Sequence, residues 1–372
     1  MDPRLDKLAD VLVNYSTQVQ PGNLVRISGS AVSRPLLVAI YRKVLAAGGH
    51  PLVNMTPDEC QVYRLLEASD EQLRFEDPLQ LHEVEKLDVA IHVWGGDNTK
   101  SLSRMAPARQ ALVSQARKRF LERFLERAAE GQLRWVGTQM PCMSAAQDAE
   151  CSLAEYEDFV FQAGLLHHDD PAAAWREVSQ RQQRLVDYLN GKQELRFVTP
   201  QGTDLKLNVT DRIWINCDGH ENFPDGEVFT GPIEDATEGT VAFSFPAVHG
   251  GREVEGAKLT FQHGKVVEAS ADKGEAFLIA MLDQDEGARI LGEIAIGTNY
   301  SVTQYSKNTL FDEKIGGTFH AAVGSAYPET GGKNRSGLHW DMVCDLRQGG
   351  QIFVDGNLIS ENGRFLDPHW PK

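Results

Sequence analysis

Two glutamates, a histidine and a tyrosine in the carboxyl-terminal half lie in positions that suit metal or acid–base chemistry. Glu227 directly follows an Asp-Gly turn and opens a strand pattern, and Glu293 lies at the head of an apolar strand pattern. His320 lies among small residues, and Tyr327 follows it seven positions later. Taken singly, each also fits an ordinary structural role, such as a solvated strand end, a capping acid or a hydrogen-bonded core histidine.

A fourth segment, residues 337–342, contains His339 and Asp341 as an H-x-D pair. Residues i and i+2 of a β-strand point to the same face, so both side chains can reach one ion while Trp340 points away. Such a pair also occurs by chance, so it supports a metal site only in combination with the other three segments.

Together the four segments supply three carboxylates, two imidazoles and one phenol in one half of the chain. Divalent ions prefer imidazole and carboxylate ligands, and small neighbouring residues leave room for metal and substrate. Two such ions would bring four positive charges, which three carboxylates and a bridging hydroxide would balance. A two-metal site built from these groups would therefore be neutral.

The elements that must position these groups change in character along the chain. The first half alternates strands and helices, with strands predicted at 23–28, 52–55, 87–94 and 133–141 and helices at 3–15, 33–49 and 106–130. Strands separated by helices imply a parallel sheet with right-handed crossovers. The strand at 87–94 is almost continuously apolar, which predicts burial on both faces.

Beyond a helix predicted at 172–190, helical periodicity becomes scarce. Strand-like segments follow, separated by turns rich in Gly, Asp and Asn, and one helix interrupts them at 273–283. We therefore expect an α/β plus mostly-β fold. An α/β domain with a parallel sheet and flanking helices spans 1–190, and a mainly antiparallel β domain that carries the metal site spans 191–372.

Composition narrows the classes of function. The 372 residues include 37 Lys and Arg against 53 Asp and Glu, a net charge of −16. Such a surface repels phosphate backbones and anionic lipids, so we expect no nucleic-acid and no membrane partner. No run approaches the ~18 apolar residues of a membrane span, and the N-terminus lacks an apolar signal core. The five cysteines form no CxxC pair, which favours free thiols and a cytoplasmic location.

Other signals have structural explanations. The first predicted βα turn is not GxGxxG and the chain has no P-loop, so nucleotide binding is disfavoured. His92 lies in a buried strand pattern and is interpreted as a core histidine. His167 and His168 precede an Asp-Pro helix start, which explains that acidic and basic cluster. Cys217 and Cys344 show nothing that separates a reactive thiol from a buried one.

The four segments resemble the motifs of a known family. They read NFPDGEVFTGP, LGEIAIG, DEKIGGTFHAAVGSAYPET and GGKNRSGLHWDM, and they are similar to those of the thermophilic aminopeptidases of peptidase family M29. The resemblance extends over most of the chain, although only these motifs are specific. It implies a metal-dependent aminopeptidase with two divalent ions per chain (zinc, cobalt or manganese). The implied metal ligands are Glu227, Glu293, His320, His339 and Asp341.

The resemblance also implies a mechanism. Two ions roughly 3.5–4 Å apart would bind a bridging water and lower its pKa to near neutrality. Tyr327 matches the family's catalytic tyrosine and would donate a hydrogen bond to the tetrahedral oxyanion, while Glu293 or Glu227 would shuttle the proton. The implied substrates are peptides with a free N-terminus, and the implied assembly is a homodimer. The loop at 328–337 is shorter than in some members, so substrate preference is not transferred.

Two alternatives remain open. Some proteins resembling this family are mononuclear Fe(II) dioxygenases that open dihydroxypyridine rings, and His320, His339 and Asp341 alone would form their 2-His-1-carboxylate face. Glu227 and Glu293 favour the two-metal interpretation over this one. A binding or scaffold protein without catalysis would be expected to lack at least one of the metal-ligating residues, and none is missing.

Lys333 and Arg335 lie in the loop before the H-x-D pair. They either contact the carboxylate end of the peptide or are solvated loop residues.

Overall fold

The computed structural model describes residues 2–372 and divides into two compact units. Unit 1 runs to Ala172 and includes the segment Gly219–Pro224, whereas unit 2 comprises Ala173–Asp218 and Asp225–Lys372. The chain therefore leaves unit 1 at residue 172, returns for six residues, and leaves again. The predicted domain boundary at residue 190 stays a prediction.

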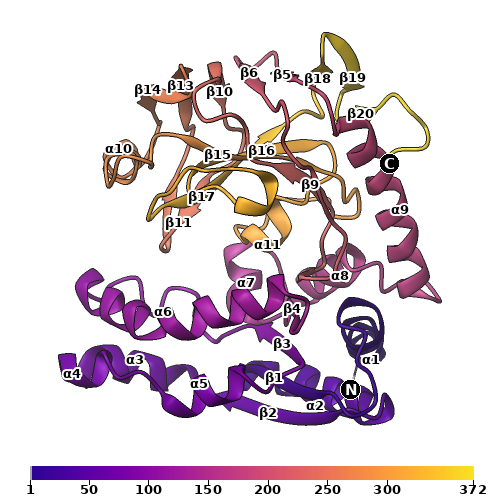
Figure 1. The fold of residues 1–372 in the computed structure, drawn as a ribbon, viewed down its shortest axis with the longest axis vertical. Helices are drawn as coiled ribbons and strands as arrows, with labels where there is room; N and C mark the ends of the chain where they lie inside the picture. The colour runs from indigo at the N-terminus through magenta and orange to yellow at the C-terminus, as the bar shows by residue number, and fades with distance from the viewer. Residues whose placement is uncertain (1) are drawn as a thin grey trace. The chain divides into compact units, whose positions relative to one another are not determined.

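Unit 1 is built on a parallel sheet of five strands, as the alternating patterns predicted (Figure 1). Its strands in spatial order are β2 (His50–Thr56), β1 (Leu24–Ser30), β3 (Val89–Trp94), β4 (Arg134–Gln139) and β8 (Asn222–Phe223). The last of these comes from the short segment that returns from unit 2. The sheet is thus completed by residues far along the chain.

Helices connect the strands of unit 1. The first helical segment ends in a π-helical stretch, and a 3-10 turn precedes the second helix. The elements are α1 (Pro3–Asp10), η1 (Val11–Ser16), η2 (Ala31–Ser33), α2 (Arg34–Ala46), α3 (Asp58–Glu67), α4 (Asp70–Leu73), α5 (Pro78–Val84), α6 (Pro107–Ala129), α7 (Met143–Asp148) and α8 (Leu153–Ala163). Within the described residues 2–372, no helix is both long and apolar enough to cross a membrane.

One expectation about this sheet was wrong. Along β3, Val89, Ile91 and Val93 are buried, but His92 and Trp94 on the other face are exposed. The strand therefore alternates, and an apolar sequence does not mean burial on both faces. His92 is not a core residue, although its Nδ1 is hydrogen-bonded to Ser28 Oγ at 2.9 Å on β1.

Unit 2 contains three antiparallel sheets, so the fold class predicted from sequence is confirmed. The eight-stranded sheet runs β14 (Lys265–Ser270), β13 (Lys258–Gln262), β10 (Glu238–Ala242), β6 (Asp204–Asn208), β5 (Glu194–Val198), β18 (Gln351–Val354), β19 (Asn357–Glu361) and β20 (Arg364–Phe365). The five-stranded sheet runs β17 (His339–Asp345), β16 (Thr318–Gly324), β15 (Leu291–Gly297), β9 (Glu227–Thr230) and β7 (Ile215–Cys217), and a hairpin pairs β11 (Ala247–His249) with β12 (Arg252–Val254).

One hydrophobic core joins the two large sheets of unit 2. Phe197 of β5 stacks on Phe319 of β16 with ring centroids 4.2 Å apart. The long helix α9 (Pro171–Leu189) contributes Leu185 and Leu189 to the same core. Shorter elements are α10 (Glu275–Leu282), α11 (Thr309–Asp312) and the 3-10 turn η3 (Pro328–Thr330). The core occupies only one face of the five-stranded sheet, which leaves the other face for polar groups.

Candidate metal centre

The six candidate residues lie on or next to the five-stranded sheet of unit 2, and strand alternation separates them from the core. On β16, Phe319 and Ala321 face the core while His320 faces the other way, and on β17 Trp340 faces the core while His339 and Asp341 do not. The period of two that predicted a shared face for His339 and Asp341 agrees with this arrangement.

The strand register places these residues in neighbouring rows of the sheet. Glu293 of β15 lies opposite Ala322 of β16, which lies opposite Asp341 of β17. His339 lies opposite Gly324, so the positions between the polar side chains carry small residues. Because directly opposed residues share a face, small neighbours leave space between the carboxylates and imidazoles.

Two backbone irregularities aim the glutamates. The pairing of β15 with β16 shifts register between Leu291 and Glu293, so Leu291 faces the core and Glu293 the polar face, although they are two residues apart. At the other glutamate, Gly226 has φ of +124°, and a Cβ there would approach Asn299 Cβ to 2.5 Å. Only glycine fits this turn, which directs Glu227 from the first position of β9.

Glu293 lies between the two imidazoles. Its Oε1 is 3.3 Å from His320 Nε2, and its Oε2 is 3.3 Å from His339 Nε2. His320 Nε2 is also 3.5 Å from Glu227 Oε2 and 3.9 Å from Asp341 Oδ1, and His339 Nε2 is 3.5 Å from Asp341 Oδ1. All five candidate ligands therefore meet around one carboxylate.

The opposite ring nitrogens fix the orientation of both histidines. His320 Nδ1 is 3.2 Å from the carbonyl oxygen of Glu313, and His339 Nδ1 is 2.8 Å from that of Ser325. A carbonyl only accepts hydrogen bonds, so each Nδ1 carries a proton and donates it. Each Nε2 is thereby aimed at the carboxylates, as in histidines that bind metals through Nε2.

The electrostatics of the cluster call for a positive charge at its centre. Burial opposes a charged imidazole, but the neighbouring carboxylates, Glu293 first, raise the pKa of His320 to about 10. Burial also opposes a charged His339, but the hydrogen bonds that its imidazole donates to Asp341 and Glu293 raise its pKa to about 11. Burial raises the pKa of Glu227 to about 8. Protons on these groups take the place that a metal cation can fill.

The donor set fits divalent cations. One triad of ligand atoms comes from Glu227, Glu293 and His320, and a second from Glu293, His339 and Asp341, with the atoms of each triad within 4.8 Å of one another. Glu227 Oε2 is buried and has no hydrogen-bond partner among residues 2–372. A buried carboxylate oxygen without a donor is suited to a cation, and Glu293 belongs to both triads.

Sequence reasoning missed three charged groups at this centre. A carboxylate oxygen of Glu313 lies within 4.8 Å of a ligand atom of His320 and of one of Asp341. The ammonium of Lys314, 1% exposed, contacts Glu313, Glu227 and Asp225. The neutral charge count above omitted these two carboxylates and this ammonium. Glu313 and Lys314 belong to the same motif as His320, but they lie outside the strand, where the period of two gives no information.

Tyr327 lies at the rim of the cluster, just before η3. Its ring packs against Phe229 and His339, with centroid distances of 5.4 and 5.1 Å, and the residue is 40% exposed. Partial burial, with the carboxylates of Glu293 and Asp341, raises the pKa of Tyr327 well above its usual range. A raised pKa keeps the phenol protonated, so that it can donate a hydrogen bond.

The loop after Tyr327 is held at several points. Lys333 N donates to Glu234 Oε1 at 2.6 Å, and Asn334 Nδ2 donates to the carbonyls of Gly287 and Gly324. The side chains of Lys333 and Arg335 are exposed. Their predicted contact with a peptide carboxylate stays a prediction.

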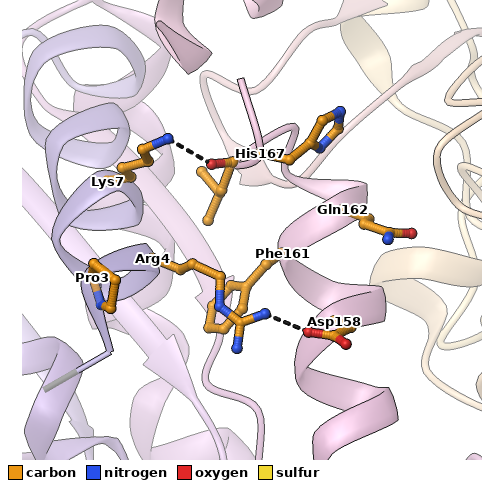
Figure 2. Close-up of a pocket in the computed structure, with 8 residues that line it drawn as sticks. Pro3, Arg4, Lys7, Asp158, Phe161, Gln162 and His167 are labelled. Carbon is orange, nitrogen blue, oxygen red and sulfur yellow. Dashed lines mark hydrogen bonds and ion pairs between the residues drawn. The ribbon is translucent and has the colours of Figure 1, made fainter. Parts of the chain in front are cut away.

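A separate pocket in unit 1 contains none of these residues. Figure 2 shows it between α1 and α8, lined by Pro3, Arg4, Lys7, Asp158, Phe161, Gln162, Leu166 and His167. The two positively charged side chains in this pocket already have partners. Arg4 pairs with Asp158 and lies over the Phe161 ring, and Lys7 Nζ donates to the carbonyl of Leu166. We assign no chemistry to this pocket.

Known proteins resemble the chain over nearly its whole length. The family of thermophilic metalloproteases (M29) matches residues 1–365. Aminopeptidase 2 of Geobacillus stearothermophilus is 30% identical over 352 residues, which cover 88% of this chain and 84% of that protein. The structure of wild-type AmpT from Thermus thermophilus superposes with a TM-score of 0.85 at 26% identity and covers 98% of this chain and 99% of its own.

A second solved structure shares the fold at lower similarity. The 2,5-dihydroxypyridine dioxygenase of Pseudomonas putida KT2440 has a TM-score of 0.61 at 12% identity, covering 99% of this chain and 98% of its own. At that identity the match indicates a common fold and carries no information about activity.

Proposed function

The chain belongs to the M29 family of thermophilic metalloproteases and is a hydrolase, and we propose that it is an aminopeptidase that removes the N-terminal residue from peptides. The observation that carries this proposal is the position of Glu293, whose two oxygens each lie 3.3 Å from one imidazole Nε2. A carboxylate shared in this way suits a centre of two cations.

We assign the two cations to the two overlapping triads. Glu227, Glu293 and His320 would hold one, and Glu293, His339 and Asp341 the other. Zinc, cobalt and manganese all accept these ligands. When bound, a pair of such ions supplies a hydroxide nucleophile at working pH and polarises the scissile carbonyl.

The protein's own groups supply the remaining chemistry. Tyr327 donates its phenolic proton in a hydrogen bond to the developing oxyanion, and its raised pKa keeps that proton in place. One of the two glutamates, Glu293 or Glu227, would act either as a ligand or as the shuttle that carries a proton from the attacking water to the leaving amine. A cation held by one of these triads would also bind the free α-amine of a peptide, which would explain why only the N-terminal residue is removed.

We further propose a cytoplasmic homodimer. Among residues 2–372 all five cysteines are free, as expected in a reducing compartment. The edge strand β2 exposes Leu52, Val53 and Met55, with exposed fractions of 42%, 49% and 44%. An exposed apolar sheet edge is a surface that association would cover.

The test is metal content together with activity. The protein is purified without chelator, its metals are measured by elemental analysis, and leucine anilide hydrolysis is followed before and after metal removal. We expect about two zinc, cobalt or manganese ions per chain. Hydrolysis should disappear on stripping and return on refilling with metal.

The main competing function is a mononuclear Fe(II) dioxygenase that uses His320, His339 and Asp341. Such a centre has no use for Glu227 and Glu293 as further ligands, yet both lie within 3.5 Å of an imidazole Nε2. One iron per chain, no anilide turnover and oxygen consumption with a dihydroxypyridine would favour it. A scaffold protein without catalysis would show neither activity.

A further inference from the structure

Lys314 is a fully buried ammonium that the proposed reaction does not use. Its side chain is 1% exposed, and Nζ lies 2.5 Å from Glu227 Oε1, 2.7 Å from Glu313 Oε1 and 3.5 Å from Asp225 Oδ1. Burying an ammonium costs several kcal/mol unless carboxylates compensate it. Stability alone is weak grounds for such a group, because apolar residues can fill the same space.

The backbone holds Lys314 in place. It directly follows α11 and Glu313, its N–H donates to the carbonyl of Phe311, and its own carbonyl accepts from Asn299 N–H, both at 3.0 Å. The backbone from which this side chain extends is therefore held beside the carboxylates.

The two oxygens of Glu227 are used differently. Oε1 accepts from Lys314, whereas Oε2 has no hydrogen-bond partner among the described residues and lies 3.5 Å from His320 Nε2. The ammonium therefore decides which oxygen faces the candidate cation. Without it, Glu227 is free to rotate and to offer either oxygen or both.

Lys314 also fills what would otherwise be another cation site. Ligand atoms of Cys217, Asp225 and Glu227 lie within 4.8 Å of one another, and the ammonium contacts the two carboxylates of this group. The protein's own positive charge thus separates this group from the triad that contains His320.

We propose that Lys314 is a positioning residue for the metal centre: it fixes Glu227 as a ligand through Oε2 alone and occupies the neighbouring acidic group. This inference rests on the proposed function. It predicts an effect confined to the cation held by Glu227, Glu293 and His320. The cation held by Glu293, His339 and Asp341 should depend much less on Lys314, because the ion pairs of Lys314 go to Asp225, Glu227 and Glu313 and to none of these three ligands.

The test is a titration of metal-stripped, full-length protein with Co²⁺, followed by calorimetry and by the visible spectrum of bound cobalt. Wild type is compared with Lys314→Met and with Lys273→Met, which removes an ammonium 65% exposed and paired with Glu255. Loss of a group that orients a ligand costs about 10- to 100-fold in metal affinity. We expect that loss at one of two sites in Lys314→Met and no change in Lys273→Met.

Other outcomes overturn the inference. Unchanged affinity at both sites would make Lys314 only structural, and tighter binding would mean that its charge merely repels the cations. An equal loss at both sites would indicate a general disturbance. If Lys314→Met does not fold, the double variant Lys314→Met, Asp225→Asn, which removes one charge of each sign, is titrated instead. Absence of cobalt binding in wild type would instead refute the proposed metal centre itself, and this inference with it.

Discussion

The edge strand β2 of the parallel sheet and the three inner strands of the five-stranded antiparallel sheet differ sharply in burial. In unit 1 the edge strand β2 exposes every residue except Pro51, including apolar ones. In unit 2 every residue of β9, β15 and β16 is buried, including Glu227, Glu293 and His320. Buried ionisable groups lower the stability of the folded state unless other charges compensate them. Their concentration on one face of this sheet therefore indicates a functional site.

The largest expected effect comes from the carboxylate at the centre of the buried face. Glu293→Gln keeps the shape of the side chain but removes the charge that lies between two imidazoles. We expect hydrolysis of a leucine anilide to fall below detection while circular dichroism stays unchanged. Retained activity would remove Glu293 from the site and weaken the contrast between the sheets.

Tyr327→Phe should have the next largest effect. The substitution keeps the ring contacts with Phe229 and His339 and removes only the hydroxyl. Loss of one oxyanion donor typically costs about 10²–10³ in kcat. Steady-state kinetics should show that loss in kcat with little change in KM. An unchanged kcat would mean that the tyrosine only packs at the rim.

A matched pair of substitutions compares the two sheets directly. Ala322 lies fully buried between Glu293 and Asp341, so Ala322→Val should cost about 1–3 kcal/mol by overpacking and should weaken cobalt binding. Val53→Thr on β2, at a side chain 49% exposed, should change stability by no more than about 0.5 kcal/mol. Equal effects in chemical denaturation would contradict the comparison.

A further prediction concerns pH. In metal-free protein the pKa values of His320 and His339 are raised to about 10 and about 11, against about 6.5 in an unfolded chain. The folded state then binds protons that the unfolded state releases. This contribution to stability is complete below pH 6.5 and is lost as the pH rises through 10 and 11. The metal-free protein should therefore melt at a lower temperature at pH 9.5 than at pH 6.

The holoprotein is the control for this pH effect. Its imidazoles would bind cations instead of protons, so its melting temperature should show a smaller decrease over the same range. Parallel curves for the two forms would indicate that other groups cause the change.

Local periodicity explains what the sequence could predict about the site. His339 and Asp341 are two residues apart on one strand, and an Asp-Gly turn announces the start of β9 before Glu227. The direction of the Glu293 side chain is harder to predict from the sequence. The register shift between Leu291 and Glu293 places the two side chains on opposite faces, although strand alternation would place them on the same face. Glycine at position 292 inside the strand is the signal for such a bulge.

Contacts between distant segments explain what the sequence could not predict. Lys314 reaches Glu227 from a segment 87 residues further along the chain, and no periodicity connects them. Similarly, the burial of each face of β3 depends on which elements pack against the sheet. His92 is therefore exposed although the sequence of the strand is almost continuously apolar. The order of strands in the parallel sheet, completed by β8, likewise depends on residues that follow α9.

The return of Gly219–Pro224 to unit 1 has a consequence for how the two units can evolve. Phe223 ends β8 at the edge of the parallel sheet, and four residues later Glu227 begins β9 with the first candidate ligand. A gene fusion or recombination event with a single crossover would deprive one unit of a strand or the other of its first helix. The two units are therefore bound to evolve as a pair, and family members should differ by insertions in loops more than by exchange of either unit.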